Sequence, residues 1–332
     1  MISSAVTRSD LPTVEDVRAA ARRIEKHAIR TPLLNSPTLD AKLGGRLFVK
    51  AEPLQRTGSF KFRGAYNKIS QIPEDRKKHG VVAFSSGNHA QGVAAAATML
   101  GIPSWIVMPK DAPAIKIART KEFGATVVPY DRYTEDREEI GARLQAERGA
   151  TLVPPFDDPD VIAGQGTIGL EIAEQCAGVG VKPDSVVVCC GGGGLVSGTA
   201  LALAGVMPGV PVYAAEPADF DDTKRSLEGG RRVGNDPAAR SICDALLSPM
   251  PGEITFALNS RLLKGGLTVT DDEARAAMRT AFVELKLVVE PGGAVALASV
   301  LSGKLPIAGK TVVVVASGGN VDPALFAQTL GC

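Results

Sequence analysis

Short uncharged runs alternate with helical patterns along most of this chain, and that alternation restricts its fold more than any other feature. Candidate strands span residues 47–51, 81–85, 104–108, 126–129, 185–190, 212–215 and 311–316. Candidate helices span residues 14–27, 89–100, 114–123, 134–147, 166–177, 196–207, 271–285 and 293–301. Strands without charges are typical of parallel sheets that helices cover on both faces. The sequence therefore predicts an α/β protein with two open, mainly parallel twisted sheets flanked by helices.

Composition argues against several kinds of partner and location. A net charge of +1 without a long basic run predicts no binding to nucleic acid or to an acidic membrane surface. Five scattered cysteines at spacings unlike those of zinc sites favour a reducing, cytoplasmic location, and we expect no signal peptide. Residues 185–207 carry no charge, but a β-rich run and four glycines favour a strand, a loop and a helix over a membrane span.

Lys61 is the residue whose predicted position says most about chemistry. One buried helical face is indicated by the spacing of Phe62, Ala65, Tyr66 and Ile69. Thr57 and Ser59 are residue types that cap helices, which would place Lys61 in the first turn. Burial or a neighbouring positive field lowers the pKa of a lysine, and its amine then forms Schiff bases with carbonyls. A solvent-exposed lysine is the alternative.

Four consecutive glycines, Gly191, Gly192, Gly193 and Gly194, follow one predicted strand and precede a predicted helix. Such a run lets backbone N–H groups approach an anion, and the helix N-terminus adds its positive dipole. The loop therefore predicts a phosphate site. A flexible turn is one alternative, and a dinucleotide site is another, because Glu216 lies at roughly the expected offset of about 20 residues.

Two further polar loops follow predicted strands, at the edge where parallel sheets bind ligands. The first loop consists of Ser85, Ser86, Gly87, Asn88 and His89. It could hold a carboxylate or orient an aromatic hydroxyl, and ordinary helix capping by Ser86 or Asn88 is the alternative. The second loop begins at Ser317, whose hydroxyl could bond a heterocyclic nitrogen. With Lys61, the three loops would supply an amine, a phosphate site, a carboxylate site and a partner for a ring nitrogen.

These motifs make the chain resemble the fold-type II pyridoxal 5′-phosphate enzymes, specifically the serine/threonine dehydratase and serine racemase family, which includes 3-hydroxyaspartate dehydratases. The resemblance runs from about Val14 to Asp322. Its motifs are Ser59-Phe60-Lys61-x-Arg63-Gly64-Ala65, the segment 85–92, Ala163-Gly164-Gln165-Gly166-Thr167, the four glycines, Ala215-Glu216-Pro217, Glu290-Pro291 and Ser317-Gly318-Gly319-Asn320. It implies a tryptophan synthase β-like fold, a homodimer, and a small mobile domain (73–152) inserted into a large cofactor-binding domain (1–72 plus 153–332).

The resemblance also implies roles for single residues. Lys61 would bind the cofactor covalently, with Phe60 packed beside the ring. Asn88 would bond the ring hydroxyl, Ser317 would face the pyridine nitrogen, and the four glycines would hold the phosphate. Ser86 matches the serine that, in the racemases, stands on the opposite face of the substrate from the lysine.

A divalent-cation site is implied in the same way. Glu216 and Asp222 match its carboxylate ligands, and Phe220 matches the residue that lends a backbone carbonyl. Oxygen ligands suit Mg²⁺ or Mn²⁺. A solvated acidic loop is the alternative.

The implied reaction is β-elimination from a small amino acid with a β-hydroxyl, yielding a 2-oxo acid and ammonia. The freed amine of Lys61 would take the Cα proton while residues 85–89 hold the α-carboxylate. L-Threonine and L-serine are the default substrates. Arg137 aligns with an arginine that contacts dicarboxylates in serine racemases, so 3-hydroxyaspartate is a candidate, unless Arg137 is simply a surface residue among acidic neighbours. Delivery of a proton by Ser86 would instead give a serine or aspartate racemase activity.

Two rival interpretations remain at this point. A β-replacing synthase of the same fold would share Lys61 and the phosphate loop, but the Glu216–Asp222 pattern and the 85–89 loop argue against it. A non-enzymatic nucleotide-binding module would share the glycine loop but would not need Lys61.

Overall fold

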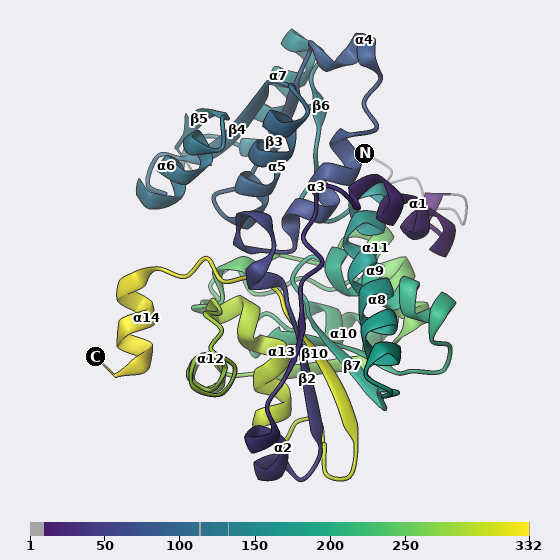
Figure 1. The fold of residues 1–332 in the computed structure, drawn as a ribbon. Helices are drawn as coiled ribbons and strands as arrows, with labels where there is room; N and C mark the ends of the chain where they lie inside the picture. Colours follow the sequence, from purple (N-terminus) through teal and green to yellow (C-terminus); the bar gives the residue numbers. More distant parts are fainter. Residues whose placement is uncertain (1–9, 113, 132, 332) are drawn as a thin grey trace.

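The computed structural model describes residues 10–112, 114–131 and 133–331, which form two sheets with helices packed around them (Figure 1). The strands are β1 (Leu33–Asn35), β2 (Arg46–Ala51), β3 (Val81–Phe84), β4 (Ser104–Pro109), β5 (Thr126–Tyr130), β6 (Thr151–Leu152), β7 (Ser185–Cys189), β8 (Val212–Pro217), β9 (Leu263–Val269) and β10 (Thr311–Ala316). The helices are α1 (Val14–Ile24), α2 (Pro37–Leu43), α3 (Lys61–Ile69), α4 (Glu74–Lys77), α5 (Asn88–Met99), α6 (Ala114–Glu122), α7 (Arg137–Arg148), α8 (Pro159–Gly178), α9 (Gly194–Val206), α10 (Asp222–Gly229), α11 (Glu253–Leu262), α12 (Asp271–Leu285), α13 (Pro291–Leu301) and α14 (Pro323–Leu330). Short 3₁₀ turns are η2 (Glu52–Leu54), η3 (Arg56–Gly58) and η4 (Asp244–Leu246).

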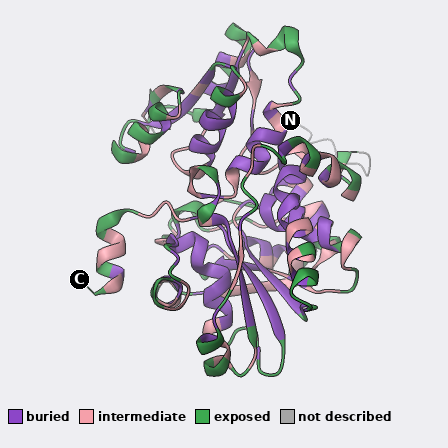
Figure 2. Ribbon diagram, viewed as in Figure 1, coloured by how far each residue is buried: buried purple, intermediate pink, exposed green. Residues whose placement is uncertain are grey.

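The larger sheet, in the lower half of Figure 1, has the strand order β1-β2-β10-β7-β8-β9. Its neighbours run parallel, except that β1 is antiparallel to β2. Every residue of β7 and β10 is buried, as the purple strands of Figure 2 show. The valine-rich sequences of both strands account for this, because β-branched side chains pack well where helices cover both faces.

The smaller sheet has the order β5-β4-β3-β6, with all neighbours parallel. Its strands all come from residues 81–152, but its hydrophobic core also includes Phe62 and Ile69 of α3. Since α3 precedes residue 73 and packs into this core, the domain boundaries expected from the sequence stay a prediction.

The predicted fold class is confirmed, and most predicted elements appear with ends shifted by a few residues. The uncharged stretch 185–207 is β7, a glycine loop and α9, as predicted. None of the helices in the described part of the chain combines the length and the apolar character needed to cross a bilayer. Three strands were missed: β1 and β6 are very short, and β9 contains Gly265 and Gly266, a residue type depleted in strands.

Candidate active site

The loops that follow β3, β7 and β10 meet around a cavity of about 700 Å³. They are the three loops that the sequence singled out. Predicted site residues lining the cavity are Phe60, Lys61, Ser85, Ser86, Gly87, Asn88, His89, Arg137, Gly191, Gly192, Gly193, Gly194 and Ser317. The geometry therefore brings the predicted amine, phosphate site, carboxylate site and ring-nitrogen partner to one place.

Lys61 is the first residue of α3, and its amine faces this cavity. Its Nζ donates a hydrogen bond of 2.6 Å to the carbonyl of Pro155 and lies 5.1 Å from the ring centroid of Phe60. Because burial disfavours the ammonium form, the pKa of Lys61 is lowered to about 8. The lower pKa increases the neutral, nucleophilic fraction of the amine near neutral pH.

The predicted start of this helix was wrong in one respect. Thr57 and Ser59 do not cap α3; its N-cap is Phe60, which makes no side-chain capping bond. Thr57 adopts a left-handed conformation (φ 62°), and extended Ser59 forms a bridge with Gly318. The backbone N–H of Phe60 donates to the carbonyl of Ser317 at 3.1 Å, so the loop after β10 fixes the start of α3.

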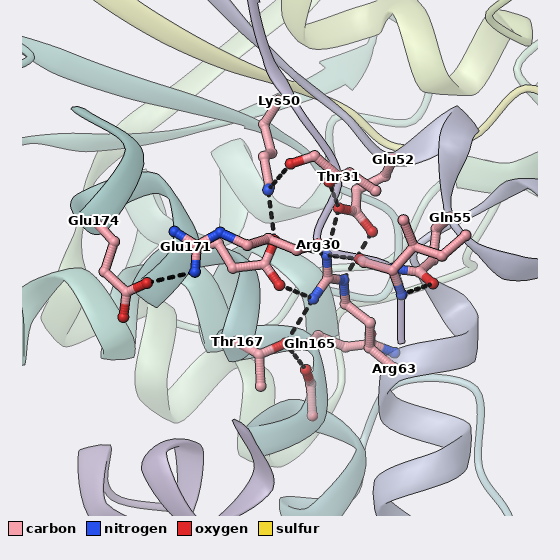
Figure 3. A network of polar contacts seen from close by, with 12 residues as sticks. Arg30, Thr31, Lys50, Glu52, Gln55, Arg63, Gln165, Thr167, Glu171 and Glu174 are labelled. Atoms are coloured by element: carbon pink, nitrogen blue, oxygen red, sulfur yellow. Dashed lines mark hydrogen bonds and ion pairs between the residues drawn. The ribbon is translucent and has the colours of Figure 1, made fainter. Parts of the chain in front are cut away.

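A buried ionic network holds the other side of α3, and the sequence reasoning did not identify it (Figure 3). The guanidinium of Arg63 lies between the carboxylates of Glu52 and Glu171, at 2.8 and 2.6 Å. Lys50 pairs with Glu171 at 2.5 Å. The side chains of Arg63, Glu52 and Lys50 are fully buried, and the four charges sum to zero, as a buried ionic cluster requires. The network positions the helix whose first residue is Lys61.

The glycine loop leaves its backbone open to a ligand. Gly193 has φ of 100°, a conformation that favours glycine, and a Cβ on Gly192 would overlap the ring of Phe156. The hydroxyl of Thr255 donates to the carbonyl of Gly192 at 2.8 Å, which fixes the loop from behind. The 13-residue α9 follows directly. A loop free of side chains at the start of a buried helix fits a phosphate group.

The 85–89 loop joins β3 to α5. The N-cap of α5 is Gly87, without a side-chain bond, so capping by Ser86 or Asn88 is not observed. Gly87 donates its N–H to Ser85 Oγ at 3.2 Å. His89 Nε2 bonds the carbonyl of Val153 at 2.8 Å, and burial together with the charge of Lys61 lowers the pKa of His89 to about 3. His89 is therefore a neutral donor to a backbone carbonyl rather than a base.

Glu290 and Asn320 also line the cavity, although the sequence analysis gave them no role of their own. Asn88 Nδ2 donates to Glu290 Oε1 at 2.6 Å, and Asn320 Nδ2 donates to Asn88 Oδ1 at 2.7 Å. Ser317, almost fully buried, closes the end of β10 beside them. The sequence signal for Glu290 was an acidic residue directly before Pro291, within one of the family motifs.

Arg137 is the first residue of α7; it is solvent-exposed, and it also lines the cavity. Its guanidinium lies over the ring of Phe84, 5.5 Å from the centroid. Two other cations of the cavity wall form ion pairs, Lys116 with Asp244 and Arg232 with Glu253. Within the described ranges, no ion pair engages Arg137, so its guanidinium remains available to an anion.

The predicted metal ligands lie apart from this cavity, at the end of β8. Glu216 and Asp222 are both fully buried, so the alternative of a solvated acidic loop is wrong. Burial, with the charge of Asp222, raises the pKa of Glu216 to about 8, and burial raises the pKa of Asp222 to about 6. Glu216 accepts backbone N–H bonds from Thr223 and Lys224, at 2.9 and 2.8 Å.

The second carboxylate has an unused oxygen. Asp222 Oδ1 accepts a bond of 2.6 Å from Asn235, whereas the buried Oδ2 has no hydrogen-bond partner among the described residues. An orphaned carboxylate oxygen beside a second carboxylate fits a divalent cation. However, no group of three or more His, Cys, Asp or Glu side chains in the described residues is placed to hold a metal, so backbone carbonyls or waters would have to complete the site.

Comparisons with known proteins agree with this geometry. The family model described as pyridoxal-phosphate dependent enzyme matches residues 24–318. L-threo-3-hydroxyaspartate ammonia-lyase of Pseudomonas sp. is 47% identical over 320 residues, covering 96% of this chain and 99% of that protein. Serine racemase of Schizosaccharomyces pombe is 41% identical over 320 residues, covering 96% and 98%.

A solved structure gives the same result. The threonine deaminase of T.th. superposes with a TM-score of 0.88 at 45% sequence identity, covering 94% of this chain and 99% of that one. The resemblance inferred from the sequence motifs is thereby confirmed over nearly the whole chain. This chain belongs to the family of fold-type II pyridoxal-phosphate dependent enzymes.

Proposed function

We propose that this enzyme removes water from a β-hydroxy amino acid and releases a 2-oxo acid and ammonia. The observation that carries the proposal is the half-buried Lys61, whose pKa is lowered and which lines one cavity together with the three loops. When bound, pyridoxal phosphate withdraws electrons from the substrate Cα and so makes its proton acidic. Lys61, Gly191 to Gly194, Ser317 and Asn88 would hold the cofactor at its aldehyde, phosphate, ring nitrogen and ring hydroxyl.

The residues of the cavity divide the remaining work. A neutral Lys61 amine is suited to take the Cα proton, since its pKa of about 8 lies close to neutral pH. The substrate α-carboxylate would bind the loop of Ser85, Ser86 and Gly87 at the start of the 12-residue α5, where the helix dipole favours an anion. Phe60 packs beside Lys61 and limits the access of water to the amine.

Arg137 favours 3-hydroxyaspartate as a substrate, beside L-serine and L-threonine. A guanidinium at the cavity wall that forms no ion pair with the described residues can bind a second carboxylate bidentately. Losing such a bond costs about 1.5–3 kcal/mol. Arg137→Ala should therefore lower kcat/KM for hydroxyaspartate about 10- to 100-fold, while the value for L-serine changes less than about threefold.

The matched control for this variant is Arg143→Ala, an exposed arginine further along α7. It should leave both substrates unaffected. Equal losses for serine and hydroxyaspartate in Arg137→Ala would contradict the second-carboxylate role.

Racemisation at the same site is a second candidate function. Ser86 lines the cavity together with Lys61, so a hydroxyl and an amine border the same space. Ser86→Ala should abolish formation of the D-amino acid from an L-substrate while the lysine-dependent elimination continues. Chiral chromatography of the amino acid pool measures the first reaction, and ammonia release measures the second.

The decisive experiment tests Lys61 directly. Borohydride reduction of the purified enzyme, followed by peptide mapping, should place the pyridoxyl label on Lys61. Lys61→Ala should lose both the label and the release of ammonia from serine, threonine and the 3-hydroxyaspartate diastereomers. A label on another lysine, or full turnover in Lys61→Ala, would overturn the proposal.

Mg²⁺ or Mn²⁺ at Glu216, Asp222 and the Phe220 carbonyl belongs to the same proposal, supported by the orphaned oxygen of Asp222.

The proposal also includes a homodimer, a cytoplasmic location, and a mobile domain of residues 73–152. The ion pair between Lys116 of α6 and Asp244 of η4 supports closure, because both residues line the cavity and they come from opposite sides of the proposed boundary.

A further inference from the structure

Glu290 occupies an unusual position at the start of α13. It is the N-cap residue, where a short polar side chain ordinarily accepts N–H bonds from its own helix. Glu290 makes no such bond, although its side chain is almost fully buried. Its Oε1 instead accepts a bond of 2.6 Å from Asn88 Nδ2 on α5, a residue 202 positions earlier. The buried carboxylate is therefore directed at a cavity residue, not at the helix it begins.

The amide of Asn88 is fixed at both ends. Its Oδ1 accepts from Asn320 Nδ2 at 2.7 Å, and Asn320 Nδ2 also donates to the carbonyl of Thr57 at 2.7 Å. Because a carboxylate accepts and an amide nitrogen donates, rotating the Asn88 amide by a half turn would set acceptor against acceptor and donor against donor. Glu290 and Asn320 thus select one orientation. One of the two N–H bonds of Asn88 Nδ2 is used by Glu290, and the other is left for a ligand.

Gly318 leaves the space in which this contact forms. A Cβ at position 318 would overlap Glu290 Oε1 and lie 3.2 Å from Asn88 Nδ2. The Glu290 backbone N–H donates to the carbonyl of Gly318 at 3.0 Å, which holds the carboxylate beside the loop after β10. Backbone and side chain therefore both place Glu290 where it reaches Asn88.

The charge of Glu290 depends on pH near neutrality. Burial, and then the charge of Asp244, raise the pKa of Glu290 to about 7, while the Asn88 bond and the charge of Lys116 oppose the rise. Asp244 and Lys116 are themselves an ion pair at the cavity wall.

We propose that Glu290 is a positioning residue, which acts through Asn88 to hold an amide N–H toward the ring hydroxyl of bound pyridoxal phosphate. The inference rests on the proposed placement of that hydroxyl at Asn88. Asn320, Asn88 and Glu290 thus form a chain of hydrogen bonds in the cavity wall, and its function is to orient the Asn88 amide.

The test compares Glu290→Gln, Glu290→Ala, Asn88→Ala and the double alanine variant. Cofactor affinity is measured by titrating each apoprotein with pyridoxal phosphate, and the absorption spectrum of the bound cofactor is recorded from pH 5.5 to 9. Glu290→Ala should weaken affinity about tenfold, whereas Glu290→Gln, whose amide oxygen still accepts from Asn88, should stay within about threefold of wild type. The wild-type spectrum should show a transition with a midpoint near pH 7 that Glu290→Gln lacks.

The double variant identifies the route of action. If Glu290 acts through Asn88, adding Glu290→Ala to Asn88→Ala should cost no further affinity. Additive losses, or a wild-type pH transition retained in Glu290→Gln, would overturn the inference alone. An unchanged affinity and spectrum in Asn88→Ala would overturn the proposed placement of the ring hydroxyl and the inference with it. Should Glu290→Ala not fold, the pH profile of Glu290→Gln decides.

Discussion

Replacing Arg63 with methionine removes one cation from the buried ionic network behind the active site (Figure 3). Arg63 binds Glu52 bidentately, at 2.9 and 2.8 Å, and binds Glu171 at 2.6 and 3.0 Å. After the substitution Glu171 keeps Lys50 as a partner, but Glu52 keeps only the hydroxyl of Thr31. Glu52 is fully buried, so the variant leaves an uncompensated carboxylate in the interior.

The expected cost follows from that orphaned charge. Removing one partner of a buried pair destabilises a fold by about 3–5 kcal/mol, because the remaining ion keeps its desolvation penalty. Adding Glu52→Gln to Arg63→Met should therefore restore part of the loss, even though it removes a further charge. The exposed pair of Arg30 and Glu174 provides the matched control: Arg30→Met should cost less than about 1 kcal/mol.

Urea unfolding followed by circular dichroism, at pH 7 with saturating cofactor, measures these differences. A loss of stability in Arg63→Met no larger than that in Arg30→Met would show that the unpaired Glu52 charge costs little. A double variant with Glu52→Gln that is less stable than Arg63→Met alone would contradict the same expectation. Lost hydrogen bonds, rather than the unpaired charge, would then account for the loss of unfolding free energy.

Three further results are expected. Burial alone would raise the pKa of Glu171, but the charge of Arg63 holds this pKa below the ordinary 4.5. The stability that the carboxylate contributes is therefore present above pH 4.5 and is lost as the pH falls through the lower pKa of the folded state. Between pH 6 and 3, wild type should lose more stability than Glu171→Gln. Gly192→Ala should weaken cofactor binding about tenfold by overpacking the phosphate loop, while Gly178→Ala, where a Cβ meets open space, leaves the affinity unchanged. Mg²⁺ should raise the thermal midpoint of EDTA-treated enzyme, and Asp222→Asn should lose that response; a persisting response would place the cation elsewhere.

The sequence predicted the fold class and the meeting of the loops after β7 and β10 because both follow from local patterns. Valine-rich runs such as 311–316 form buried parallel strands, and parallel strands bring their carboxyl ends to one edge. This rule accounts for the meeting of the loops after β7 and β10, whereas β3 belongs to the smaller sheet, so the packing of the two sheets brings its loop to the same cavity. Charge burial was not local in this way: Arg63 and Glu171 are 108 positions apart, and nothing near either residue in the sequence marks it as buried. The prediction that Thr57 or Ser59 caps α3 was wrong because of another contact between residues distant in sequence: Ser59 pairs with Gly318.

These long-range contacts explain how the reactive amine is placed. On one side of Lys61, the Phe60 N–H donates to the Ser317 carbonyl and joins the start of α3 to the larger sheet. On the other side, Arg63 binds Glu52, which follows β2, and Glu171, which lies on α8. A Cβ on Gly92 would lie 3.1 Å from the Lys61 carbonyl carbon, so α5 also packs closely against the same turn. Contacts on three sides thus fix the backbone from which the Lys61 amine reaches the cavity.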